Sequence, residues 1–276
     1  MNIKQSTLRV REMNNPVLNV NSVSKDFGGI RALDEVDLVV GDKEIVALIG
    51  PNGAGKTTFF NCITGIYTPT SGEVLIDPKI TGKPRRINGK KPNVVTELGM
   101  ARTFQNIRLF PSMTALENVM IGTHCRTTSS IWGAVSRNKA TRKEEQAVVQ
   151  RSYELLKLVG LEQYVNELAS NIAYGKQRRL EIARALATDP FLLLLDEPAA
   201  GMNPQETLEL ERLIVDIREQ FNISIMLIEH DMKMVMSMSD RIYVLDYGRM
   251  IADGTPQEIA ENPAVIKAYL GEDDDD

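Results

Sequence analysis

Hydrophobic residues gather in short unbroken runs along this chain, and each run ends at glycine or at polar residues. The runs at 45–49, 191–195 and 223–228 lead into a glycine-rich stretch, a pair of carboxylates and a histidine, respectively. Short apolar runs without alternation are typical of parallel strands that are buried on both faces. We therefore predict an α/β fold with a mostly parallel central sheet, in which the ends of the strands carry the chemistry.

Other patterns predict the elements around that sheet. Residues from about 17 to 77 are β-rich and predict an antiparallel layer that leads into the core. Apolar residues from 143 to 160 recur at near-helical spacing, and Gly160 can end that helix. These apolar positions fit either an internal core or a docking groove, and both interpretations stay open.

Several smaller segments complete the picture. The basic segment 79–91 contains glycine and proline and predicts a solvated surface hairpin or loop rather than a phosphate site. A short C-terminal helix is predicted over 254–270, followed by a disordered acidic tail at 272–276. The insertion at 129–139 has no interpretation. Four methionines follow the histidine at helical spacing: Met232, Met234, Met236 and Met238. They fall on two faces of one helix and indicate adaptable packing, and a partner surface is the alternative.

The glycine-rich stretch after the first apolar run has the spacing G-x-x-x-x-G-K-[ST]. Glycines in this pattern let backbone N–H groups turn inward around a β-phosphate, and a helix that begins near Lys56 adds its positive end. Lys56 would neutralise the β- and γ-phosphates, and Thr57 would offer a hydroxyl to Mg²⁺. A chance glycine-rich turn is the alternative, and the flanking strand and helix argue against it. We therefore predict that ATP and Mg²⁺ bind at Gly50, Pro51, Asn52, Gly53, Ala54, Gly55, Lys56, Thr57 and Thr58.

Two carboxylates follow the second apolar run. Asp196 would hold Mg²⁺ directly or through water. Glu197 is one residue further along a strand and would point the other way, where it could polarise a water for attack on the γ-phosphate. A solvated turn after a core strand is the alternative, and Pro198 supports a turn there. The phosphate loop upstream favours a catalytic pair.

Two segments between the phosphate loop and these carboxylates resemble the ABC-type ATPases. In residues 101–105 (ARTFQ), Gln105 is similar to the family's Q-loop glutamine, which reaches Mg²⁺ and the attacking water. Residues 172–186 resemble the family's signature sequence and the helix that follows it. In this family the signature closes over the ATP of a second subunit, so the resemblance implies a head-to-tail pair of ATPases. The signature positions that would contact this nucleotide are Ala173, Tyr174, Gly175 and Lys176.

Two further residues match the family's order of motifs. His230 follows the third apolar run and resembles the switch histidine that contacts the γ-phosphate; a satisfied surface or core histidine is the alternative. Phe27 resembles the aromatic residue that stacks on adenine, for which a π face suffices. Hydrophobic filler in a small sheet is the alternative for Phe27.

The resemblance runs from about residue 16 to 271 and narrows to the branched-chain amino acid importer ATPases of the LivG type. Three short sequences carry this resemblance: AYG in the signature, EPAAGMNP after the carboxylates and IEHDMK around the histidine. It implies a second ABC ATPase subunit, two transmembrane permeases and an extracytoplasmic solute-binding protein as partners. It also implies a peripheral position on the cytoplasmic face of the inner membrane. Importers of urea or short-chain amides, or of other amino acids, rank second.

Some positions depart from the general family pattern. Ala173 replaces a serine, Asn203 replaces the aspartate of the D-loop, and Lys176 replaces a glutamine. The backbone N–H groups at the start of the signature helix remain available to an anion. The sequence leaves open whether both ATP sites of a dimer hydrolyse.

The resemblance implies one ABC ATPase domain over residues 1–276, with a phosphate-loop NTPase core and two subdomains. The predicted parts are a β-rich region with the phosphate loop at 17–77, a helical subdomain at 106–171, the signature, Walker B and switch core at 172–250, and the C-terminal helix and tail at 251–276.

Composition agrees with a folded, membrane-associated ATPase that does not itself span a membrane. The chain has 276 residues, of which 43% are hydrophobic and 25% are charged. No apolar run approaches the roughly 20 residues that cross a bilayer, so we expect a chain that is soluble when isolated. Its two cysteines suggest neither a disulfide framework nor a metal site, and a net charge of −5 argues against nucleic acid as a partner.

Two alternatives belong to other functional classes. A soluble ABC-type ATPase acting on DNA or the ribosome would carry a long coiled-coil insertion or two fused ATPase halves, and the chain has neither. A nucleotide-binding regulator without turnover would lack the catalytic carboxylate, whereas Glu197 is present. We therefore predict an ATPase that powers uptake of leucine, isoleucine and valine through partner permeases.

Overall fold

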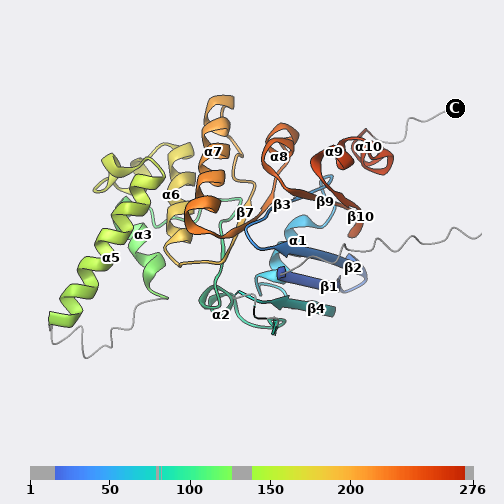
Figure 1. Ribbon diagram of the computed structural model, residues 1–276, viewed down its shortest axis with the longest axis horizontal. Helices are drawn as coiled ribbons and strands as arrows, with labels where there is room; N and C mark the ends of the chain where they lie inside the picture. The colour runs from blue at the N-terminus through green and yellow to red at the C-terminus, as the bar shows by residue number, and fades with distance from the viewer. Residues whose placement is uncertain (1–15, 79–80, 82, 126–138, 271–276) are drawn as a thin grey trace, which may run out of the picture.

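A six-stranded sheet forms the centre of the molecule in the computed structural model, which describes residues 16–78, 81, 83–125 and 139–270 (Figure 1). Its strands follow the order β10-β9-β3-β8-β7-β6. The neighbours from β9 to β6 are parallel, and β10 pairs antiparallel with β9. The predicted parallel sheet is confirmed. The strands are β3 (Ile45–Ile49), β6 (Met100–Arg102), β7 (Leu192–Asp196), β8 (Ser224–Ile228), β9 (Arg241–Asp246) and β10 (Arg249–Gly254).

A separate antiparallel sheet is built from the N-terminal part of the chain. Its order is β2-β1-β4-β5, and each neighbouring pair is antiparallel. Lys83, Arg85 and Arg86 lie exposed at its edge, as the basic segment predicts for these residues. The strands are β1 (Pro16–Phe27), β2 (Ile30–Gly41), β4 (Ser71–Ile76) and β5 (Arg85–Arg86).

The unbroken apolar strands are explained by two hydrophobic cores, one on each face of the central sheet. In β3, Ile45, Ala47 and Ile49 belong to the core under the helices, whereas Val46 and Leu48 belong to the core shared with the antiparallel sheet. Helix α1 (Lys56–Ile63) contributes its phenylalanines to the second core. A strand that serves two cores needs no polar face.

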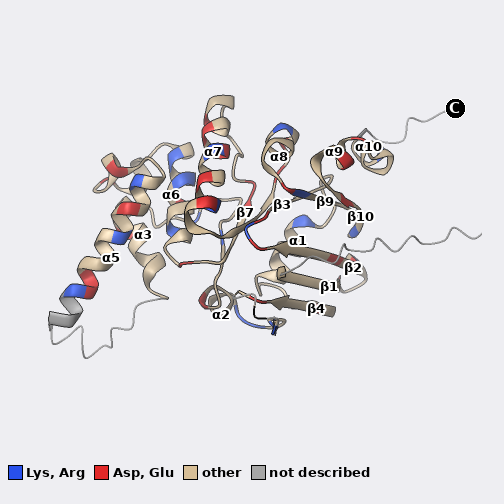
Figure 2. Cartoon of the chain, viewed as in Figure 1, with Lys and Arg blue, Asp and Glu red and all other residues tan. Residues whose placement is uncertain are grey.

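Helices cover the other face of the central sheet, and α3, α5 and α6 gather at the left end of Figure 1. Charged residues are frequent on α5, α6 and α7, while the strands of the central sheet carry few (Figure 2). Helix α5 ends before Gly160, whose φ is +70°, as predicted. Its exposed Tyr153 and buried Ser152 show that apolar spacing did not identify the core face at that turn. The helices are α3 (Ala115–Thr123), α5 (Lys139–Leu158), α6 (Tyr174–Leu186), α7 (Pro204–Phe221) and α8 (Met232–Met238).

The prediction of a single helix over 254–270 is wrong. Helix α9 (Pro256–Ala260) ends before a second helix, α10 (Pro263–Leu270). Pro263 lacks a backbone N–H and its ring excludes a preceding turn, so it begins a new helix. The remaining short elements are α2 (Pro92–Glu97) and the 3₁₀ turns η1 (Glu162–Tyr164) and η2 (Ala169–Asn171).

The methionines of α8 lie on two faces, as predicted. Met234 and Met238 are buried, while Met232 and Met236 are partly buried against the same core. The expectations for the acidic tail, for nearly all of the 129–139 insertion and for part of the basic segment fall outside the described residues. Within the described ranges, no helix combines the length and the apolar character needed to cross a membrane.

Candidate nucleotide site

The phosphate loop leaves the end of β3 through backbone conformations that favour glycine. Gly50 has a φ of +150°, and a Cβ atom there would lie 2.0 Å from the carbonyl oxygen of Leu245. Gly55 has a φ of +105° and precedes α1 as its N-cap residue. These two glycines allow the chain to turn tightly from the strand into the helix. The positive end of α1 therefore faces the space that the loop surrounds.

Lys56 lies inside the loop. Its side-chain Nζ donates to the carbonyl oxygens of Gly50 at 2.7 Å and Pro51 at 2.9 Å. Burial lowers the pKa of Lys56, and the nearby charge of Glu197 opposes that shift. Thr57, the next residue, is exposed. A cation and a hydroxyl are therefore presented at adjacent positions at the start of α1.

Asp196, the predicted Mg²⁺ residue, forms a buried ion pair. Its Oδ2 lies 2.6 Å from Arg102 Nη2, and the two side chains are 4% and 6% exposed. Arg102 also donates to Asn61 Oδ1 at 2.8 Å and to Thr64 Oγ1 at 3.2 Å, both on or beside α1. Sequence reasoning missed Arg102, although it stands in the segment that identified Gln105. Its role depends on a contact across 94 residues, which no local pattern signals.

Glu197 lies between Gln105 and His230. Its Oε2 accepts a hydrogen bond from Gln105 Nε2 at 2.7 Å, and its Oε1 lies 3.1 Å from His230 Nε2. The backbone of Glu197 has left β7 and has a φ of +48°. The strand alternation that we used to orient Glu197 therefore does not apply, and a left-handed turn sets its direction instead. The structure thus brings together three predicted site residues from three separate segments.

Glu229 is a second residue that sequence reasoning missed. Its carboxylate is buried and accepts hydrogen bonds from the N–H groups of Ala199 at 2.7 Å and His230 at 3.0 Å. Burial raises the pKa of Glu229, and these N–H groups lower it. Asp231 follows and caps α8 through the N–H of Lys233 at 2.9 Å. His230 is therefore held in a fixed loop, two residues beyond the end of β8.

Phe27 ends β1 and is 41% exposed, so part of its ring is open to solvent. Its ring meets the ring of Tyr67 edge-on, with the centroids 5.1 Å apart. Lys25 Nζ lies 5.0 Å from the centre of the Phe27 ring. The hairpin that carries Phe27 borders the phosphate loop, because a Cβ at Gly55 would lie 2.8 Å from the carbonyl oxygen of Ala32. An exposed aromatic face beside the loop suits adenine stacking.

The signature residues lie elsewhere, at the start of α6. Ala173 is the N-cap residue and makes no side-chain capping bond, so the first N–H groups of the helix are not capped by it. A Cβ at Gly175 would lie 3.0 Å from Glu206 Oε1 on α7, and Lys176 Nζ donates to the hydroxyl of Tyr164 at 2.5 Å. In Figure 1, α6 and α1 lie on opposite sides of β7. These contacts do not join the signature to the phosphate loop of the same chain.

Asn203, at the D-loop position, caps helix α7. Its side-chain oxygen accepts from the N–H groups of Gln205 and Glu206, both at 3.0 Å, and Glu206 returns a bond to the N–H of Asn203. This reciprocal capping box needs an acceptor oxygen, which asparagine shares with aspartate. The amide therefore keeps the local structure of the turn without adding a charge.

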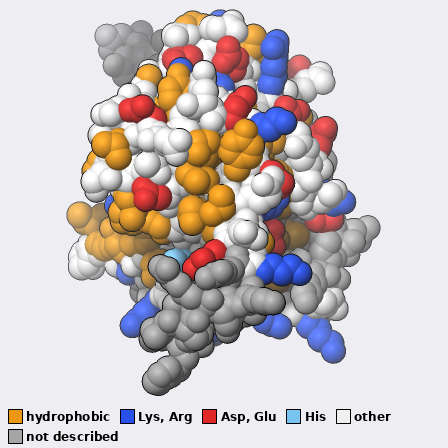
Figure 3. Space-filling model, turned by 90° about the vertical axis from the view of Figure 1, so that its left-hand side faces the viewer, with side chains coloured by type: hydrophobic (Ala, Val, Ile, Leu, Met, Phe, Trp, Pro, Cys, Tyr) orange, Lys and Arg blue, Asp and Glu red, His pale blue; other side chains and the backbone are white. Residues whose placement is uncertain are grey.

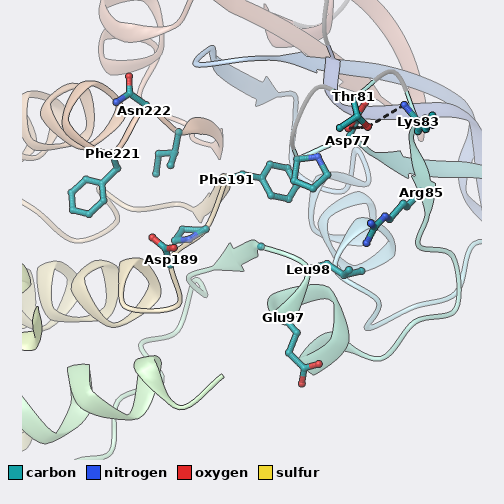
Figure 4. A pocket seen from close by; sticks show the side chains of 14 residues that line it. Asp77, Thr81, Lys83, Arg85, Glu97, Leu98, Asp189, Phe191, Phe221 and Asn222 are labelled. Atoms are coloured by element: carbon teal, nitrogen blue, oxygen red, sulfur yellow. Dashed lines mark hydrogen bonds between the residues drawn. The ribbon is translucent and has the colours of Figure 1, made fainter. Parts of the chain in front are cut away.

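A separate cleft of about 1130 Å³ lies away from this site (Figure 4). Its walls include Gly99 before β6, Phe191 before β7 and Ile223 before β8. These residues precede the strands, whereas the phosphate loop, Glu197 and His230 follow them. The cleft therefore opens at the opposite edge of the sheet from the nucleotide site. Figure 4 shows Asp77 and Lys83 on one side and Asp189 and Asn222 on the other.

Models of known protein families match most of this chain. A family model for ABC transporters matches residues 33–200, and a model for branched-chain amino acid ATP-binding cassette transporters matches residues 249–275. The chain is 48% identical to the high-affinity branched-chain amino acid transport ATP-binding protein LivG of Salmonella typhimurium, over 94% of this chain and 100% of LivG. It is 46% identical to the corresponding protein BraF of Pseudomonas aeruginosa, with the same coverage.

Solved structures agree with the sequence relatives. The ADP conformation of MJ1267, an ATP-binding cassette of an ABC transporter, has a TM-score of 0.79 and 30% identity, and covers 93% of this chain and 99% of that one. A dimeric structure of the cassette MJ0796 with ADP and phosphate has a TM-score of 0.72 and 26% identity, and covers 87% and 98%. The predicted fold class and family are confirmed. This chain belongs to the ATP-binding proteins of ABC transporters, of the branched-chain amino acid LivG type.

Proposed function

We propose that this chain hydrolyses ATP with Mg²⁺ to power the import of branched-chain amino acids through partner permeases. The observation that carries the proposal is the position of Glu197, held between Gln105 and His230 at 2.7 and 3.1 Å beside the phosphate loop. A carboxylate in that position can orient and deprotonate an attacking water. The amino acid class rests on relatives that are named for it and match along their whole length.

ATP would be held by the phosphate loop and by Phe27 at the end of β1 in the antiparallel sheet. Backbone N–H groups from Asn52 to Thr58 would surround the phosphates, and Lys56 would exchange its two carbonyl partners for phosphate oxygens. This exchange is favourable because an ammonium binds a charged oxygen more strongly than a carbonyl oxygen. Phe27 would stack on adenine through its exposed face.

The donor set suits Mg²⁺ in a nucleotide site. The protein ligands would be oxygen atoms of Thr57, Asp196 and Gln105, which is the chemistry that Mg²⁺ prefers. Among the described residues, no three carboxylate, histidine or cysteine side chains gather to hold a metal without help. This fits an ion that takes its remaining ligands from phosphates and water. When bound, Mg²⁺ supplies positive charge to the β- and γ-phosphates.

The catalytic residues would divide the remaining work. Glu197 would take the proton of the attacking water, and Gln105 would place that water through its amide. His230 would contact the γ-phosphate from the loop fixed by Glu229. Arg102 would hold the Asp196 carboxylate in its orientation at the end of β7 through their ion pair.

A second ATPase subunit would complete each site. Tyr174, at the start of the signature helix, is 48% exposed, so this end of α6 is accessible to a partner. The N-terminus of α6 offers N–H groups to an anion. In the ABC family the signature closes over the ATP of a second subunit, so this anion would be a phosphate of the partner's ATP. The dimer of MJ0796 with ADP and phosphate is an example of such pairing in a related cassette.

Permeases would dock at the helical end of the molecule. Hydrophobic side chains gather on this end, which faces the viewer in Figure 3. Phe110 is 46% exposed, and an apolar pocket of about 340 Å³ between α3 and α5 includes Met113 and Met120. Exposed apolar surface of this kind marks an interaction site. Such docking would place the chain on the cytoplasmic face of the membrane. An extracytoplasmic solute-binding protein would deliver the amino acid to the permeases from the other side.

Purification from the native host in mild detergent, followed by mass spectrometry, tests the proposal. We expect two polytopic permeases and a second ATPase to copurify with the wild-type chain. The variant Phe110→Glu should lose the permeases, because it places a charge on the apolar end. Ile266→Glu is the matched control, since Ile266 is 44% exposed on α10, and it should retain them. Ribosomal or DNA-bound partners without permeases would contradict the transport function.

A further inference from the structure

A buried group of charged side chains on α6 takes no part in the site described above. Arg178 and Glu181 form an ion pair at 3.1 Å, and their side chains are 0% and 1% exposed. Arg184, three residues further on, approaches Glu181 at 3.7 Å. Steps of three residues place these side chains on one face of the helix. We call Arg178, Glu181 and Arg184 the α6 charge cluster.

Arg178 binds the main chain around Gln105. Its Nη1 donates to the carbonyl oxygen of Phe104, and its Nη2 donates to the carbonyl oxygen of Gln105 at 2.6 Å. A guanidinium presents its donors in a fixed fork, so two adjacent carbonyls bound to one fork are fixed relative to each other. Arg178 therefore holds the backbone from which the Gln105 side chain reaches Glu197.

The rest of the cluster binds the main chain three residues later. Glu181 Oε1 accepts from the N–H of Arg108 at 3.2 Å, and Arg184 Nη1 donates to the carbonyl oxygen of Arg108. Residues 104–108 belong to no helix or strand. The α6 charge cluster thus supplies hydrogen bonds that regular secondary structure would otherwise provide.

Stability alone does not explain a buried ion pair at this position. Removing two charges from water is costly, and apolar side chains of similar volume often replace such pairs without loss of stability. Within the described residues, Arg178 Nε is also buried without a hydrogen-bond partner. Burial raises the pKa of Glu181, although the Arg108 N–H and Arg178 oppose that shift. What the pair provides in return is a fixed backbone at Gln105.

Arg178 also contacts the signature. The hydroxyl of Tyr174 accepts from Arg178 Nη2 at 3.3 Å, and the same Nη2 holds the Gln105 carbonyl. The side chain of Gln105 in turn reaches the catalytic site, where its Nε2 lies 2.7 Å from Glu197 Oε2. One guanidinium therefore touches the site that would receive the partner's nucleotide and the loop that serves the chain's own site.

We propose that Arg178, supported by Glu181, is a positioning residue that couples the signature of this subunit to Gln105 in its own catalytic site. The inference rests on the proposed ATPase function, in which Gln105 places the attacking water. A shift of α6 on nucleotide binding at the signature moves the carbonyl of Gln105 with it. The side chain of Gln105 then changes its position against Glu197, so each site responds to the occupancy of the other.

Arg178→Lys tests this coupling in the full chain purified with its partners. A lysine presents a single charged nitrogen and cannot bind both carbonyls as a fork does. We expect kcat for ATP to fall about tenfold, because a misplacement of roughly 1 Å costs up to about a hundredfold. KM for ATP should stay within about twofold, since the phosphate loop is untouched. The matched control is Arg179→Lys, because Arg179 pairs with Glu209 on the helix surface, and kcat should not change.

A second pair of variants separates positioning from a general structural role. In a Gln105→Ala background, Arg178→Lys should change kcat by less than about twofold, because the residue through which it acts is absent. Equal losses in both backgrounds would overturn the inference. If the lysine variant folds poorly, the paired change Arg178→Met with Glu181→Leu removes both charges together and should give the same pattern.

Hydrogen exchange read by mass spectrometry gives a measure that needs no turnover. The amides of residues 104–108 should exchange faster in Arg178→Lys than in wild type or Arg179→Lys, and equal rates would overturn the inference. These outcomes are distinct from failure of the proposed function. A wild-type complex without ATPase activity would refute the function. An active complex in which Arg178→Lys lowers kcat equally in the wild-type and Gln105→Ala backgrounds would refute the coupling alone.

Discussion

Replacing Glu197 with glutamine should stop hydrolysis while leaving the nucleotide bound. The carboxylate serves two neighbours, Gln105 Nε2 at 2.7 Å and His230 Nε2 at 3.1 Å. Glutamine has the same length, and its oxygen can still accept from Gln105 while its NH₂ group faces His230. The site therefore keeps its geometry and loses its base.

The size of the effect follows from that single loss. General-base catalysis contributes about 10²- to 10⁴-fold, so kcat should fall by that factor, or about 2.7 to 5.4 kcal/mol. ATP affinity should stay equal or become up to about tenfold tighter, because the carboxylate near Lys56 no longer repels the phosphates. The variant should therefore accumulate with ATP bound.

Phosphate release at saturating ATP and Mg²⁺ measures kcat, and a fluorescent ATP analogue measures affinity. Glu197→Asp is the matched control, because it keeps the charge but withdraws it from Gln105 and His230, and its kcat should lie between those of wild type and Glu197→Gln. A Glu197→Gln variant with kcat within about threefold of wild type would refute the assignment of the base. Loss of ATP affinity in step with kcat would show that Glu197 acts in binding.

Two substitutions and one labelling experiment test separate parts of the account. Lys56→Ala should weaken ATP binding at least about tenfold in a direct binding assay, and unchanged affinity would remove Lys56 from the phosphate site. Gly50→Ala should lower the free energy of unfolding by about 1–3 kcal/mol in urea titration, since its Cβ would lie 2.0 Å from the Leu245 oxygen; wild-type stability would disprove this loop geometry. Burial raises the pKa of Cys62 to about 11, so its thiol should stay protonated and unreactive toward a thiol reagent at pH 8. Cys125 is only half-buried and should react. Two equally reactive thiols in the native protein would contradict the burial of Cys62.

The sequence allowed the phosphate loop and the strand ends to be predicted because their signals are local. The run 45–49 and the glycine spacing after it specify a strand, a tight turn and a helix without reference to the rest of the chain. The carboxylates and His230 could be placed near this loop because parallel strands end at the same edge of a sheet. The parallel order of the strands therefore explains why His230 lies beside Glu197.

Other parts of the site depend on contacts that no local pattern contains. Arg102 and Asp196 are 94 residues apart, and Arg178 and Gln105 are 73 apart, yet both pairs are in direct contact. The left-handed turn at Glu197 is also not encoded by a glycine, so the direction of its side chain could not be read from strand alternation. By contrast, the end of α9 could have been found, because Pro263 is a visible signal.

Transport itself is the most direct test of the central claim. The complex purified from the native host would be reconstituted into liposomes with its solute-binding protein, and uptake of labelled leucine would be followed on addition of ATP to the ATPase side. We predict ATP-dependent accumulation with the wild-type chain and none with Glu197→Gln. ATP hydrolysis without leucine, isoleucine or valine uptake in the wild-type complex would contradict the proposed function.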